Sequence, residues 1–186
     1  TSTFYRKGDG FYVRTDGPDG ELTDYAIAYT FGVYPLQQCL IEMPGGRLQA
    51  LSIVWDSRPQ SDGGQRWYHL YPDEPIRAGD ELHWTGLNQN WNFMCADCHS
   101  TNLQKNYDLD TDTYATTWNE IDVGCEACHG PGSVHVEAMQ AKDWDQPFNG
   151  FALSLSREQA TAWELDPQTG SPKPASAGPA MQPELE

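Results

Sequence analysis

Two Cys-x-x-Cys-His motifs stand 30 residues apart in this chain of 186 residues, at 95–99 and 125–129. Two thiols separated by two residues reach the two vinyl groups on one edge of a porphyrin, and the histidine that follows faces the iron. With five cysteines and five histidines in the chain, one match arises by chance in on the order of a few chains per thousand. Two independent matches are far rarer, so the pattern predicts two covalently attached c-type haems.

The haem interpretation gives a role to both cysteines and to the histidine of each motif, because the thiols form thioethers and each histidine binds an iron. The predicted thioether cysteines are Cys95, Cys98, Cys125 and Cys128, and the predicted proximal iron ligands are His99 and His129. Thioether bonds prevent loss of the cofactor. This attachment suits a small domain that cannot enclose a haem.

Each iron also accepts a distal ligand, and the three remaining histidines are candidates, with His135 and His83 preferred over His69. His135 follows Gly130-Pro131-Gly132 in the first turn of a predicted helix, close to one motif yet able to point toward a neighbouring iron. His83 lies where the first part of the chain meets the part that carries the motifs. We expect His135 to be a distal ligand ahead of His83, with packing or solvent-facing roles as the alternatives.

A zinc site is the main alternative for the four motif cysteines. Two Cys-x2-Cys pairs together resemble a zinc-ribbon arrangement of four thiolates. This interpretation leaves His99 and His129 as accidents of the sequence. Where haem has not been attached, the same cysteines would form disulfides, remain free thiols or bind zinc.

The charge of the chain argues against nucleic acid and anionic lipid as partners. Eleven Lys and Arg against 27 Asp and Glu leave a formal charge of -16, which repels nucleic acid and anionic lipid. The sequence contains no run of about 18 to 20 apolar residues, the length needed to cross a bilayer. Because haem is normally attached outside the cytoplasm, we expect a periplasmic or otherwise exported protein whose leader was removed or lies upstream.

The expected fold class is α+β. Short runs rich in β-branched and aromatic residues alternate with turn signals in residues 1–85, which predicts an antiparallel β meander. Residues 86–165 are predicted to form a loop-rich, partly helical region that carries the two haem motifs, with helices at 133–142 and at about 156–163. The Pro-rich residues 166–186 are predicted to be an extended tail or linker.

Three segments together resemble bacterial multihaem c-type cytochromes that carry tetratricopeptide repeats: Phe31–Gln38, Trp91–Leu103 and Cys125–Ser133. The resemblance runs over most of residues 1–165. In such proteins further haem motifs flank this region and helical repeats follow it, whereas this chain has neither. The resemblance therefore implies an internal fragment of a longer haem region, and the run ending at His135 looks like one that supplies a distal ligand to another haem.

These observations favour an electron carrier over an enzyme. Two haems would relay electrons to a redox partner protein or to other haems of the same longer polypeptide, with no substrate chemistry required. A haem-based reductase or oxidase with one open iron site is an alternative, and so is a structural zinc-binding module of four cysteines. We expect no nucleic-acid partner and no membrane span.

Overall fold

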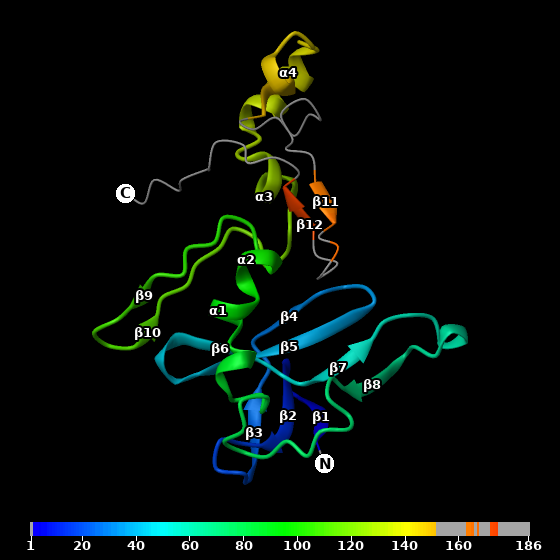
Figure 1. Cartoon of the computed structure of the whole chain (residues 1–186), viewed down its shortest axis with the longest axis vertical. Coiled ribbons are helices and arrows are strands. Elements are labelled where there is room, and N and C mark those ends of the chain that lie inside the picture. The colour runs from blue at the N-terminus through cyan, green and yellow to red at the C-terminus, as the bar shows by residue number, and fades with distance from the viewer. Residues whose placement is uncertain (1, 152–162, 166, 168–171, 175–186) are drawn as a thin grey trace. The chain divides into compact units, whose positions relative to one another are not determined.

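The computed structural model describes residues 2–151, 163–165, 167 and 172–174 (Figure 1). The chain divides into two compact units, Thr1–Ala127 and Cys128–Glu186. The first unit contains most of the β-structure, and the second begins within the second Cys-x-x-Cys-His motif. In the described part of the chain, none of the helices has both the length and the apolar character that crossing a bilayer requires.

The chain begins with a three-stranded antiparallel meander, in the order β1 (Thr3–Lys7), β2 (Gly10–Asp16) and β3 (Leu22–Ala26). Gly8 makes the first turn with a φ of 61°, which glycine adopts without a Cβ penalty. In β2, Val13 and Thr15 are buried while Arg14 between them is exposed. This alternation follows from the two-residue repeat of a strand and turns one face of the meander toward a core.

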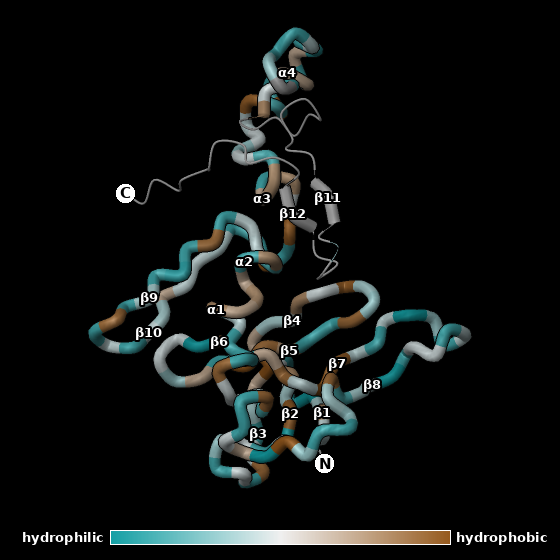
Figure 2. Tube along the Cα trace, in the orientation of Figure 1, coloured by the Kyte–Doolittle hydropathy of each residue, from teal (hydrophilic) through white to brown (hydrophobic). Residues whose placement is uncertain are grey.

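A five-stranded antiparallel sheet follows the meander. Its strands are β4 (Tyr29–Phe31), β5 (Leu36–Met43), β6 (Arg47–Ala50), β7 (Ile53–Asp56) and β8 (Arg66–His69). The hydrogen-bonded order is β4-β5-β7-β8, and β6 also pairs with β5. Strand β5 is therefore the centre of the sheet, and hydrophobic segments gather around it (Figure 2).

Alternate residues of β5 enter two separate hydrophobic cores. Leu40 packs with Trp91 and Ala96, which flank the first cysteine of the motif at 95–99. Cys39 and Ile41 point to the other face and pack with a cluster that also contains Val13 of the meander. One strand thus joins the meander on one face to the segment carrying the first motif on the other.

The remaining elements are short. The helices are α1 (Trp91–Met94), α2 (Ala96–His99), α3 (Cys125–His129) and α4 (Ser133–Ala141), and the 3-10 turns are η1 (Pro44–Gly46), η2 (Gln60–Asp62), η3 (Leu87–Gln89) and η4 (Pro147–Gly150). The further strands form two antiparallel pairs, β9 (Tyr107–Asp108) with β10 (Thr113–Tyr114) and β11 (Trp163–Leu165) with β12 (Pro172–Pro174).

The predicted α+β class is wrong, because the described chain is mostly β. The predicted N-terminal meander is present, but between the two motifs the chain forms a hairpin ladder rather than helical or irregular structure. The pair β9–β10 is extended by the bridges Gln104↔Thr117 and Thr101↔Glu120. Paired segments this short leave no period-two pattern in the sequence, so only the pairing itself reveals them.

The predicted helix at 133–142 is confirmed as α4, which ends at Ala141 with Lys142 in the left-handed conformation. The helix predicted at about 156–163 lies outside the described residues, except that Trp163 begins β11. Within the predicted tail, the described residues include β12, which pairs with β11.

Candidate haem-attachment sites

The helix before the first motif is anchored to β6 by a buried asparagine. Asn92 is fully buried, and its Oδ1 accepts a 2.7 Å hydrogen bond from the backbone N–H of Leu48. Its Nδ2 donates to the backbone oxygen of Gly46 at 3.2 Å and to Thr116 Oγ1 at 2.8 Å. One side chain therefore joins α1, β6 and the segment after β10.

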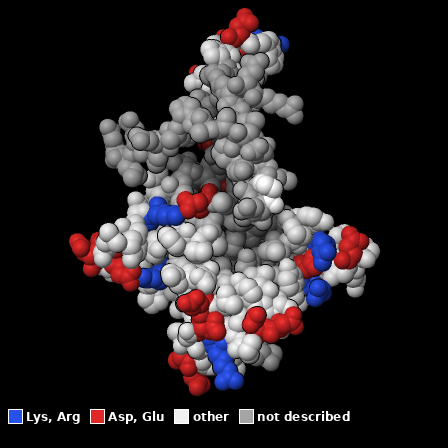
Figure 3. All heavy atoms as spheres, in the orientation of Figure 1, with Lys and Arg blue, Asp and Glu red and all other residues white. Residues whose placement is uncertain are grey.

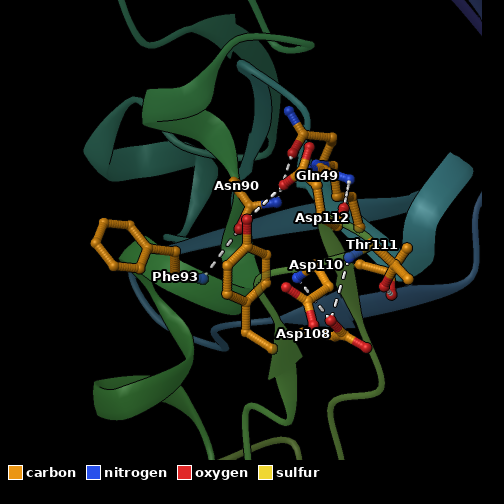
Figure 4. Close-up of polar contacts among 10 residues, drawn as sticks. Gln49, Asn90, Phe93, Asp108, Asp110, Thr111 and Asp112 are labelled. Atoms are coloured by element: carbon orange, nitrogen blue, oxygen red, sulfur yellow. Dashed lines mark hydrogen bonds and ion pairs between the residues drawn. The ribbon is translucent and has the colours of Figure 1, made fainter.

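A second buried amide pair supports the same helix (Figure 4). Asn90 Oδ1 accepts from the backbone N–H of Phe93 at 3.0 Å, which caps α1, and Asn90 Nδ2 donates to Gln49 Oε1 at 3.0 Å. Gln49 Nε2 in turn donates to the backbone oxygens of Trp84 and Gly86 at 3.0 and 2.9 Å. Because these groups are buried and mutually satisfied, the start of the first motif is held in one position.

The first motif exposes Cys98 and His99, while Cys95 packs against the core. Ala96 has no exposed surface and packs into the core that contains Trp91, whereas Cys98 and His99 are exposed and Cys95 is half-buried. The backbone N–H of Cys98 donates to the carbonyl of Cys95 at 3.1 Å. Burial, and secondarily the nearby Cys98, raises the pKa of the Cys95 thiol.

Aromatic and apolar surface borders this motif. The His99 imidazole lies edge-on to the Phe31 ring, with ring centroids 5.2 Å apart and planes at 75°. Phe93 and Met94, immediately before Cys95, are 54% and 52% exposed. Exposed apolar side chains beside the exposed Cys98 thiol and an imidazole leave a surface that a large apolar group would cover favourably.

The second motif occupies α3, and a buried threonine holds the residue before it. The hydroxyl of Thr101 donates to the backbone oxygen of Asp122 at 2.8 Å and accepts from the N–H of Gly124 at 2.8 Å. The thiols of Cys125 and Cys128 are exposed. Both motifs thus present two unpaired thiols on a helical turn.

In the second unit, two histidines contact the same aromatic ring. The Phe151 ring lies 4.9 Å from the His129 ring and is stacked on His135 at 4.1 Å, with an interplanar angle of 21°. His135 Nδ1 is 2.7 Å from the backbone oxygen of Asn149. A carbonyl only accepts, so Nδ1 is the donor, and in the neutral imidazole Nε2 is the nitrogen with the available lone pair.

His83 occupies a different environment. It is 4% exposed, with Nε2 3.0 Å from Asp16 Oδ2 and Nδ1 2.7 Å from Thr85 Oγ1. Burial opposes ionisation of Asp16, but hydrogen bonds, first among them the one from His83, outweigh it and lower the pKa of that carboxyl. Both ring nitrogens therefore have protein partners, and the geometry gives no support to His83 as an iron ligand.

Residues 71–130 match the family model of cytochrome c554 and c-prime. The matched segment covers 60 of the 186 residues and includes both Cys-x-x-Cys-His motifs. It supports a relation to c-type cytochromes, with haem c as the cofactor and electron transfer as the role. No curated protein and no solved structure matches the chain significantly.

The first motif fits the covalent haem of such cytochromes. Its two thiols and imidazole lie within one helical turn, with Cys98 and His99 exposed, next to exposed apolar side chains. Among the described residues, no three His, Cys, Asp or Glu side chains are arranged to hold a metal ion, and all five cysteines are free thiols. Free thiol pairs are the form that thioether attachment requires.

The sequence did not reveal several residues that shape the surroundings of the two Cys-x-x-Cys-His motifs. Phe31 and Gln49 lie more than 40 residues before the first motif. Asn92 lies next to the motif, but its partner Leu48 is 44 residues away from it. Asn149 and Phe151 position His135. Their only local signal is the pair of asparagines Asn90 and Asn92 just before the first motif, where polar residues interrupt an otherwise aromatic run.

Proposed function

We propose that this chain is an electron-transfer portion of a multihaem c-type cytochrome and carries two covalent haems. The thioethers form at Cys95, Cys98, Cys125 and Cys128, and the proximal ligands are His99 and His129. The observation that carries the proposal is the outward presentation of the first motif, with Ala96 packed in the core while Cys98 and His99 face solvent. The match to the cytochrome c554 and c-prime family supports it.

When bound, a c-type haem supplies an iron that is reversibly reduced by one electron. The chain's own residues hold and orient that group. Phe31 restrains the ring of His99, and Asn92 fixes the helix that leads into the motif. The net charge of -16, with acidic groups spread over the face shown in Figure 3, favours the more positive oxidised state and lowers the potential.

His135 serves as a distal ligand in this proposal. A metal-binding histidine commonly donates its other ring N–H to a carbonyl or carboxylate, which fixes the tautomer and the ring orientation. His135 has that arrangement, with Nδ1 on the Asn149 carbonyl and a stacked Phe151 ring. The iron it serves belongs to a neighbouring haem, in this chain or in the longer polypeptide.

The proposed setting is the periplasm or another exported location, with redox proteins or further haems as partners. The acidic surface would attract a basic partner and steer its approach. The chain carries out no substrate chemistry in this proposal.

Intact mass spectrometry of the full chain, exported with haem-attachment machinery, tests the proposal. Two additions of roughly 616 Da each, the mass of haem, are expected. The double variant Cys95→Ser/Cys98→Ser should lose one addition, and Cys125→Ser/Cys128→Ser the other. Cys39→Ser is the matched control and should keep both. A wild-type chain without covalent haem under these conditions would contradict the proposal.

A further inference from the structure

The β-rich unit contains a cleft that neither Cys-x-x-Cys-His motif borders. Its volume is about 450 Å³, within the range of roughly 300 to 1,000 Å³ that small-molecule sites occupy. The meander lines it from one side, and β4, β5 and β8 line it from the other. We call it the aromatic cleft, after Phe4, Tyr5, Phe11, Tyr12 and Trp67 in its wall.

Flat rings from both sheets form one end of this wall. Phe4 of β1 stacks on Trp67 of β8 with centroids 4.0 Å apart and an interplanar angle of 11°, and Trp55 supports Trp67 edge-on at 5.3 Å. Trp67 is still 44% exposed, and Phe11 is 59% exposed. A braced aromatic face that remains open offers a stacking surface for another planar ring.

The charges around the cleft disfavour an ionic ligand. Arg6 is the lining cation, but its Nε donates to the Gly8 carbonyl at 2.9 Å, and its guanidinium lies 3.5 Å from Asp9 and 5.7 Å from the centre of the Phe11 ring. The overall charge of -16 repels anions further. Burial raises the pKa of the Cys39 thiol to about 11, so this lining side chain stays neutral at physiological pH.

Polar groups at the cleft are few. Gln37 already donates to the Gly32 carbonyl at 3.3 Å, and Thr30 contributes one exposed hydroxyl. A sugar would need a dense set of hydrogen-bond partners for its hydroxyl groups, because each one left unpaired on burial costs about 1 to 3 kcal/mol. A mostly apolar ring with one or two oxygen substituents needs far fewer.

We propose that the aromatic cleft binds a neutral, planar ring compound with carbonyl or hydroxyl substituents, of the quinone class. The ring stacks on the open face of the pair formed by Phe4 and Trp67, and the ring oxygens meet the neutral polar groups at Thr30 and Gln37. The claim concerns binding alone. It stands on the cleft and holds whether or not haems are attached.

Isothermal titration calorimetry of the full chain with duroquinone tests the proposal. This quinone is fully substituted on the ring, so it does not add to the exposed thiols. Saturable binding at one site is expected. The variant Trp67→Leu keeps an apolar side chain but removes the flat ring, and it should weaken binding about 10-fold, which corresponds to about 1.4 kcal/mol. Trp144→Leu changes another exposed tryptophan, one outside the cleft, and this control variant should bind as the wild type does.

A second variant blocks the cleft without removing a ring. Thr30 is exposed on β4, where a large aromatic side chain is compatible with a strand, so Thr30→Trp should fold and abolish binding. Circular dichroism verifies folding of each variant. The proposal is overturned if the wild type shows no saturable binding, if both cleft variants bind as tightly as the wild type, or if cellobiose binds more tightly than duroquinone. Because the measurement reports binding and not haem content, its failure leaves the electron-transfer proposal untouched.

Discussion

The amide oxygen of Asn92 lies 2.7 Å from the backbone nitrogen of Leu48 and is the hydrogen-bond acceptor that ties α1 to β6. Both groups are buried, so replacing Asn92 by an apolar residue leaves the Leu48 N–H without a hydrogen-bond partner. Asn92→Leu should therefore lower the free energy of unfolding by about 1 to 3 kcal/mol, measured by urea denaturation. Asn119→Leu, at an exposed position, is the control and should change it by less than about 0.5 kcal/mol.

Replacing His135 and replacing His83 should affect the iron spin state of the haem-loaded protein differently. Removing a distal ligand converts a low-spin iron to a high-spin one, so His135→Ala should produce a high-spin signal in electron paramagnetic resonance. His83→Ala should leave the spin state unchanged, because both ring nitrogens of His83 are already hydrogen-bonded. A high-spin signal from the His83 variant alone would reverse the two assignments.

Thiol exposure predicts the order of alkylation in protein without haem. Cys98, Cys125 and Cys128 are exposed, whereas burial raises the pKa of Cys39 to about 11 and leaves very little thiolate. Because the thiolate is the nucleophile, iodoacetamide at pH 8 should modify the three exposed cysteines first and Cys39 last, as followed by peptide mass spectrometry. After haem attachment, only Cys39 should remain available to alkylation under denaturing conditions.

The stability of the fold should depend on pH through the ionisation of Asp56. Arg58 binds it through Nε–Oδ1 at 3.0 Å and Nη2–Oδ2 at 2.7 Å, and this hydrogen bonding lowers the pKa of Asp56 to about 2. A lowered folded-state pKa stabilises the fold above the unfolded value of roughly 3.9. This stabilisation is lost as the pH falls from about 4 toward 2.

The melting temperature of Asp56→Asn should thus lie below that of the wild type at pH 6, with the gap closing as the pH approaches 2. Asp9→Asn removes a carboxylate from the exposed pair with Arg6 and serves as the control. Its melting temperature should follow the wild-type curve. A gap of constant size for Asp56→Asn across this pH range would rule out ionisation as the cause.

Glycine is required at position 46, where η1 lies against strand β10. Its φ is +69°, and a Cβ at this position would clash with the backbone oxygen of Tyr114. Gly46→Ala should cost more than the 1 to 2 kcal/mol of a left-handed residue, because β10 must also move. Gly63, with φ of +79° and open space around it, is the matched control. Gly63→Ala should cost about 1 to 2 kcal/mol by chemical denaturation, and equal losses for both variants would exclude the close contact as the cause.

The sequence by itself determined the features that depend on neighbouring residues. The spacing within Cys95–His99 and Cys125–His129 predicts the proposed haem attachment, because both thiols and the imidazole must lie on one short turn. The N-terminal meander and the helix at 133–142 were likewise predictable, since turn residues and strand-forming runs act over a few positions. These signals involve only residues that are a few positions apart, so they do not depend on how the rest of the chain folds.

Only the tertiary structure decided the features that join distant residues. His83 meets Asp16 across 67 positions, and the aromatic cleft depends on Phe4 lying against Trp67. The ladder between the two motifs arose in the same way, from the pairing of Gln104 with Thr117 and of Thr101 with Glu120. Such pairings follow from the summed burial and hydrogen bonding of the whole unit, which no short stretch of sequence encodes.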